Sequence, residues 1–160
     1  MELDSSHIRR YLRAFDFKTL FVEELGWDRH DTHLDVHVDG QTFVLTATAE
    51  KRGMVAFTCV TLGDGRIPDY STRRKIERQT AKSVHEHLII YTDTDKTTQI
   101  WQWVKRELCK PTACREHTYH RDQPGDALIQ KFQSIAFSLE EEERLTIVDV
   151  TKRARTAFDV

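Results

Sequence analysis

The segment TATAEKRGMVAFTC, residues 46–59, places a carboxylate and an amine side by side, in Glu50 and Lys51, beside a tight turn. Two further carboxylates, Asp35 and Asp39, lie upstream in a stretch of alternating apolar and polar residues. Two carboxylates can hold Mg²⁺ while a neighbouring lysine assists an attacking water. The pattern predicts a catalytic set of Asp35 or Asp39 with Glu50 and Lys51, in which Asp35 and Glu50 ligate the metal ion.

The period of a β-strand decides whether Glu50 and Lys51 act together. Side chains two positions apart in a strand share a face, whereas adjacent side chains point to opposite faces. Glu50 and Lys51 therefore need a β-bulge to meet at one metal ion. Without such a bulge they are solvated hairpin residues, and both interpretations stay open from the sequence.

A second group of residues is basic and lies in TRRKIERQTAK, residues 72–82. Five cations stand against one acid, Glu77, which leaves a local charge of +4. Such a helix either neutralises DNA phosphates without reading bases, or is a solvated surface. The candidate DNA-binding residues are Arg73, Arg74, Lys75, Arg78 and Lys82.

Four side chains of types that bind zinc lie close together in CKPTACREHTYH, residues 109–120. Their spacing is not one of the usual zinc-finger or zinc-knuckle spacings, so coincidence within a loop is the simpler interpretation. The four residues are Cys109, Cys114, His117 and His120.

The composition predicts one soluble domain that spans residues 1–160. The chain is 39% apolar, and its formal net charge of −2 neither requires nor excludes a nucleic-acid partner. Three cysteines and an N-terminus without an apolar leader favour the cytoplasm. No apolar run approaches the roughly 20 residues of a membrane helix, so no membrane partner is expected.

Hydrophobic periodicity predicts ten elements in the order ααβββαββαα, with a mixed sheet of about five strands flanked by helices. The segment between the last strand and the last two helices, residues 109–126, is expected to be a loop. The expected helices are 5–15, 17–25, 71–87, 127–137 and 145–158. The expected strands are 34–38, 42–50, 54–60, 87–93 and 97–105.

Five segments carry a resemblance that spans nearly the whole chain: FDFKTLFVEELGWD, AEKRGMVAF, RKIERQTAKSVHEHLIIYTD, IWQWVKRE and IAFSLEEEERLTIVDVTKRARTAFDV. Together they resemble the N-terminal region of single-chain restriction-modification proteins with an Eco57I-like adenine methyltransferase domain downstream. The resemblance implies an α/β (α+β) module with a restriction-endonuclease-like, PD-(D/E)xK-type core, which is the N-terminal part of a larger protein.

Two functions follow from this resemblance. The first is a Mg²⁺-dependent endonuclease of a restriction-modification or phage-defence system, with a degenerate site made from the carboxylates and lysine above. The alternative is a non-catalytic module that binds double-stranded DNA or serves as a scaffold, and so positions an adenine methyltransferase or nuclease partner. The chain itself carries no NPPY-type methyltransferase motif and no Gly-rich cofactor loop.

Overall fold

The computed structural model describes residues 5–61, 65–84, 86–105 and 113–123, together with residues 125, 128 and 130. The chain divides into two compact units, Met1–Gly125 and Asp126–Val160, and every helix and strand described below belongs to the first. The helices expected at 127–137 and 145–158 fall outside the described residues, apart from residues 128 and 130.

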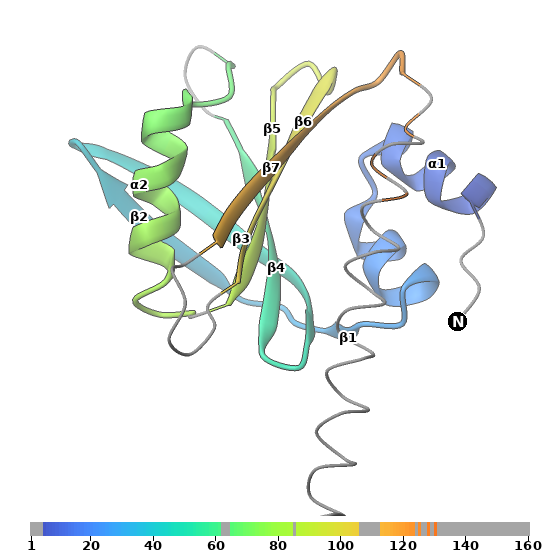
Figure 1. Cartoon of the computed structure of the whole chain (residues 1–160), viewed down its shortest axis with the longest axis horizontal. Coiled ribbons are helices and arrows are strands. Elements are labelled where there is room, and N and C mark those ends of the chain that lie inside the picture. The colour runs from blue at the N-terminus through green and yellow to red at the C-terminus, as the bar shows by residue number, and fades with distance from the viewer. Residues whose placement is uncertain are drawn as a thin grey trace, which may run out of the picture. The chain divides into compact units, whose positions relative to one another are not determined.

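Two short helices, α1 and η1, lie on one face of the sheet (Figure 1). α1 spans Ser5–Ala14 and buries Ile8 and Leu12, two of the apolar positions whose helical spacing predicts this element. η1 spans Thr19–Glu24 and is a π-helix. Asp16 precedes it as expected of a capping residue, since its Oδ1 accepts from the backbone N–H of Thr19 at 3.3 Å.

Seven strands form a single sheet in the order β1-β3-β4-β5-β6-β7, and β2 pairs with β3. Every neighbouring pair is antiparallel except β4 and β5, which are parallel. The strands are β1 Asp28–Arg29, β2 His33–Val38, β3 Gln41–Lys51, β4 Met54–Val60, β5 His87–Thr92, β6 Thr98–Lys105 and β7 Ala113–His120.

The expected antiparallel meander is confirmed in β2, β3 and β4. Asp39 and Gly40 form the turn between β2 and β3, with φ values of 50° and 79°. Positive φ at both central residues is the requirement of a type I′ turn, which the Asp-Gly dipeptide predicts. Arg52 and Gly53, with φ values of 53° and 84°, make the corresponding turn between β3 and β4.

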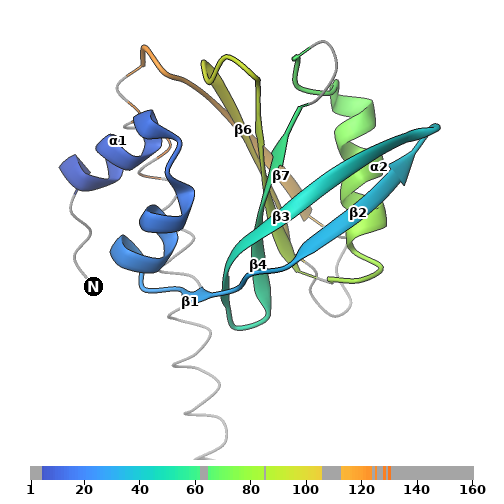
Figure 2. The ribbon, with the colours of Figure 1, turned by 180° about the vertical axis from the view of Figure 1, so that it is seen from behind.

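α2, Tyr70–Thr80, carries the chain from β4 to the parallel strand β5. Parallel neighbours require such a crossover, and α2 lies on the face of the sheet opposite α1 (Figures 1 and 2). Its N-cap is Asp69, whose Oδ1 accepts from the Thr72 N–H at 2.8 Å. This hydrogen bond lowers the pKa of the Asp69 carboxyl.

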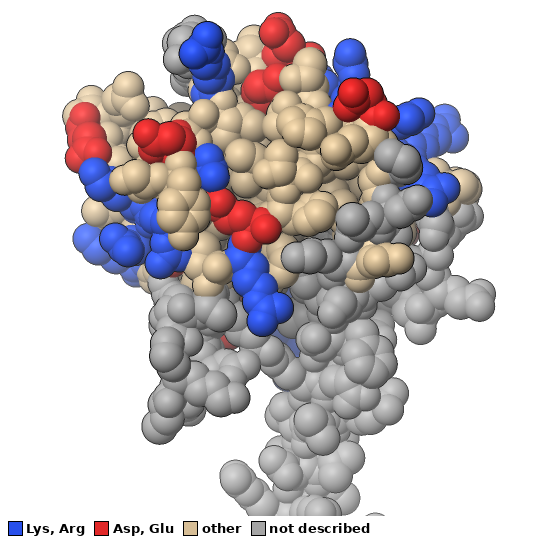
Figure 3. Space-filling view, turned by 45° about the horizontal axis from the view of Figure 1, so that its top comes forward, with Lys and Arg blue, Asp and Glu red and all other residues tan. Residues whose placement is uncertain are grey.

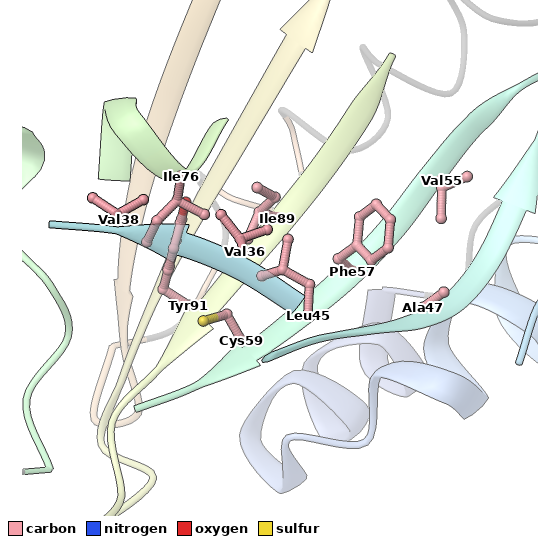
Figure 4. Packing of buried hydrophobic residues seen from close by; sticks show 10 residues of the cluster. All are labelled: Val36, Val38, Leu45, Ala47, Val55, Phe57, Cys59, Ile76, Ile89 and Tyr91. Atoms are coloured by element: carbon pink, nitrogen blue, oxygen red, sulfur yellow. The ribbon is translucent and has the colours of Figure 1, made fainter. Parts of the chain in front are cut away.

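The core between α2 and the sheet is an apolar cluster drawn from both (Figure 4). Ile76 of α2 is fully buried and packs with Val36 and Val38 of β2 and with residues of the central strands. The buried members are Val36, Val38, Leu45, Ala47, Val55, Phe57, Cys59, Ile76, Ile89 and Tyr91. Because α2 packs on β2, it also covers one face of this outer strand of the sheet.

β7 corrects the expectation of a loop across residues 109–126, since Ala113–His120 pairs along its length with β6. Tyr119 is the strand's deeply buried apolar residue. The strand is otherwise mostly polar, so it lacks the apolar alternation by which the other strands are predicted.

The described residues form a mixed α+β architecture, with a mostly antiparallel central sheet and helices on both of its faces. Among the described helices, none is long and apolar enough to cross a membrane.

Candidate functional site

The register of the sheet separates the two carboxylates expected to share a metal ion. Asp35 on β2 lies opposite Val44 of β3, whereas Glu50 lies opposite Val55 of β4. Val44 and Glu50 are six residues apart on β3, and at about 3.3 Å per residue this is roughly 20 Å. Ligands of one Mg²⁺ lie about 2.1 Å from it, so Asp35 and Glu50 do not form a common site in this structure.

Glu50 and Lys51 follow a β-bulge, but the bulge does not bring them together. It lies between Ala47 and Ala49, before the pair. Glu50 then faces Val55 and Lys51 faces Met54 in consecutive register, so the two side chains point to opposite faces of the sheet.

The carboxylates of the expected metal site have other neighbours. Glu50 Oε2 lies 3.5 Å from Nδ1 of His30, and both side chains are partly exposed. Asp39 Oδ2 accepts from Lys75 Nζ at 2.7 Å, which ties the tip of the β2–β3 hairpin to α2. Within the described part of the chain, no group of three or more His, Cys, Asp or Glu residues is arranged to hold a metal ion.

The basic residues of α2 divide into two sets, and Arg73 belongs to the set that points inward. Its Nε and Nη2 donate to the two carboxylate oxygens of Glu116 on β7, each at 2.9 Å. Its Nη1 donates to the carbonyl oxygen of Pro68 at 2.6 Å. This bidentate pair raises the pKa of the Arg73 guanidinium, and little of it remains for an external phosphate.

Arg74 also turns toward the sheet. Its Nη1 lies 3.6 Å from Oε2 of Glu77, whose side chain is 1% exposed. Cys114 on β7 interacts electrostatically with this guanidinium, and burial raises the pKa of its thiol. Arg74 is therefore a neighbour of buried groups between α2 and the sheet.

Glu116 connects Arg73 to polar residues that the sequence does not single out. Its Oε2 accepts from Nε2 of Gln102 at 3.0 Å, and Oε1 of Gln102 accepts from the hydroxyl of Tyr91 at 2.8 Å. Burial raises the pKa of Tyr91 well above its usual value, so the hydroxyl stays a donor. No motif marks this network, which the pairing of β5, β6 and β7 assembles under α2.

The remaining cations of the helix segment point to solvent. Lys75 and Arg78 are exposed at positions i and i+3 of α2, which share one side of a helix, and Lys82 is exposed in the turn that follows the end of the helix at Thr80. We call these three residues the outer basic stripe. Lys75 has Asp39 as its partner, and within the described residues neither Arg78 nor Lys82 forms an ion pair. Figure 3 shows Lys and Arg side chains on the side of the molecule where α2 lies and also on the opposite side.

The cysteine and histidine residues of the possible zinc site do not share a face in β7. Cys114 pairs with Val104, His117 with Trp101 and His120 with Thr98 in uninterrupted register. His117 therefore points to the face opposite Cys114 and His120. Cys109 lies outside the described residues.

Comparison with known proteins adds no relative, because no protein-family model, curated protein or solved structure matches this chain.

Proposed function

We propose that this chain is a non-catalytic module of a restriction-modification or phage-defence protein, which holds the backbone of double-stranded DNA against α2. In that role it would position an adenine methyltransferase or nuclease partner. The observation that carries the proposal is the division of the helix's cations, with Arg73 and Arg74 held by the protein and the outer basic stripe presented to solvent.

The outer basic stripe has the dimensions of a backbone contact. From Lys75 to the end of α2 at Thr80 the helix axis advances roughly 8 Å, and Lys82 follows in the next turn. Duplex DNA carries one phosphate per 3.4 Å of axis on each strand, so the stripe passes about two to three phosphates. Cations at this spacing neutralise phosphates and release counterions, but they do not distinguish bases. The proposed contact is therefore salt-sensitive and independent of sequence, which suits a module that supports a partner.

The order of elements supports a restriction-endonuclease-like core as part of this proposal. Helical segments precede an antiparallel meander, and α2 then leads to β5, which runs parallel to β4. A helix, a three-stranded meander, a helix and a returning strand is the order of a restriction-endonuclease-like core, for which DNA is the expected partner. Fold alone does not assign an activity, so the proposed contact rests on the outer basic stripe.

The register of the sheet favours the non-catalytic role over the endonuclease. We expect calorimetric titration with Mg²⁺ and then Mn²⁺ to give the same isotherm for the wild-type chain and for Glu50→Ala, because Asp35 lies too far from Glu50 to complete a site. Specific binding of the metal ion by the wild type that is lost in Glu50→Ala would contradict the non-catalytic role and favour the endonuclease.

DNA binding tests the proposal directly. We expect Lys75→Gln/Arg78→Gln/Lys82→Gln to weaken binding to a fluorescent duplex about 10- to 100-fold in low salt, since three phosphate contacts are lost. The slope of log K against log salt should become shallower by about 2.7, or 0.9 for each contact. Fluorescence anisotropy across a salt series measures both quantities, and glutamine preserves helix propensity.

A matched variant separates a local contact from the effect of total charge. Arg10→Gln/Arg13→Gln/Lys18→Gln removes the same charge from exposed positions in and after α1, on the other side of the sheet. We expect this variant to bind duplex DNA much as the wild type does. Equal losses in the two triple variants would show that the outer basic stripe is not the contact.

A further inference from the structure

Asp39 forms an ion pair with the outer basic stripe. Lys75 Nζ donates to Asp39 Oδ2 at 2.7 Å, and the two side chains are 48% and 67% exposed. The pair lies in solvent, so water and counterions screen it, unlike the buried pair of Arg73 with Glu116.

The fold holds Asp39 in this position. It is the first residue of the two-residue turn between β2 and β3, where its φ of 50° and the φ of 79° at Gly40 set the direction of the hairpin tip. Ile76 of α2 packs with Val36 and Val38 of β2, the strand that leads into this turn, and this packing fixes α2 against the hairpin. The carboxylate is thus presented to the stripe by two anchored elements rather than by a free loop.

A carboxylate and a phosphate are both anionic acceptors for a lysine ammonium. We propose that Asp39 competes with DNA phosphates for Lys75 and so weakens binding at the outer basic stripe. This inference rests on the proposed function. An exposed ion pair contributes little free energy, so a phosphate displaces Asp39, but the released carboxylate then remains beside the DNA and repels it. Asp39 at the hairpin tip therefore lowers the affinity of the outer basic stripe for the DNA backbone.

Asp39→Asn in the full chain tests the competition. Asparagine tolerates the left-handed conformation, so the turn is preserved while the charge is removed. We expect duplex DNA to bind about two- to fivefold more tightly in low salt, in line with the strength of exposed ion pairs. The salt slope should change by much less than the roughly 0.9 of one contact, because Lys75 already meets a phosphate in the wild type and only the repulsion by the released carboxylate is removed.

Two further variants show whether the effect is local. In the Lys75→Gln background, Asp39→Asn should lose most of its effect, because the competing cation is gone. Asp31→Asn removes the same charge from an exposed residue ahead of β2 and should change the affinity less than Asp39→Asn does. Circular dichroism of each variant confirms that the fold is retained.

The outcomes distinguish this inference from the function on which it rests. Equal DNA affinity in Asp39→Asn and Asp31→Asn would overturn the competition but not DNA binding by the stripe. The same holds if Asp39→Asn raises the DNA affinity as much in the Lys75→Gln background as in the wild type. Wild-type binding that is absent, or unchanged in the triple variant of the stripe, overturns the proposed function and the inference together.

Discussion

Glu116→Ala should lower the free energy of unfolding by about 3 kcal/mol, the lower end of the range for breaking a buried ion pair. The Arg73 and Glu116 side chains are only 12% and 17% exposed, and they form a bidentate pair. The substitution leaves a guanidinium charge largely out of water and removes the acceptor of Gln102 Nε2. Urea unfolding followed by circular dichroism measures the loss.

The double variant Arg73→Met/Glu116→Leu is the control for this prediction. It removes both charges and retains apolar volume, so most of the stability lost in Glu116→Ala should return. A loss below about 1 kcal/mol in Glu116→Ala would mean that the pair behaves like a surface salt bridge, and the assignment of Arg73 to a structural role would be wrong.

Trp101→Ala should lower the free energy of unfolding by about 3–5 kcal/mol. Trp101 is 1% exposed and joins the sheet to the helices on its face, with its ring 5.9 Å from that of Phe17 and 5.7 Å from that of Phe21. Its indole N–H also donates to Gln99 Oε1 at 2.9 Å. The substitution removes this anchor and leaves a cavity beneath η1.

Trp103→Ala is the matched variant, because Trp103 lies on the same face of β6 but is only partly buried. We expect it to cost less than half as much stability. Amide hydrogen exchange provides a second measurement: in Trp101→Ala the amides of α1 should exchange faster relative to those of α2. Equal losses for the two tryptophans would contradict the anchoring role of Trp101.

The elements with a strong local signal are those that the sequence predicts well. Alternation at Leu34, Val36 and Val38, followed by Asp39-Gly40, specifies a strand and a type I′ turn through local sterics and side-chain period. β4 is recognised because it is apolar almost throughout, as a strand covered on both faces must be.

β7 could not be recognised in this way, because Tyr119 is its deeply buried apolar residue and the side that meets α2 carries Glu116 and Cys114. Glu116 and Cys114 are accommodated under α2 only because Arg73 and Arg74 meet them there. That pairing depends on residues about 40 positions away, so no local pattern reveals it. The same contacts decide which cations of α2 point to solvent.

The two carboxylates of the expected metal site, Asp35 and Glu50, lie apart for a related reason. A sequence shows that Asp35 and Glu50 both lie on strands, but their separation depends on register across the whole β2–β3 hairpin. β3 extends for 11 residues. Asp35 on β2 lies opposite Val44 in the first half of β3, whereas Glu50 is near the other end, so the two carboxylates are far apart although their strands are neighbours.

The single parallel pairing, between β4 and β5, has a consequence for how the chain folds. β2, β3 and β4 are linked by tight turns, and β5 and β6 are joined by another short turn, so these hairpins can form from local contacts. The β4–β5 seam instead brings together residues about 30 positions apart and must wait for the crossover helix. We therefore expect the closure of this seam to be a late step of folding, so that variants that weaken the docking of α2 slow refolding more than variants within the hairpins.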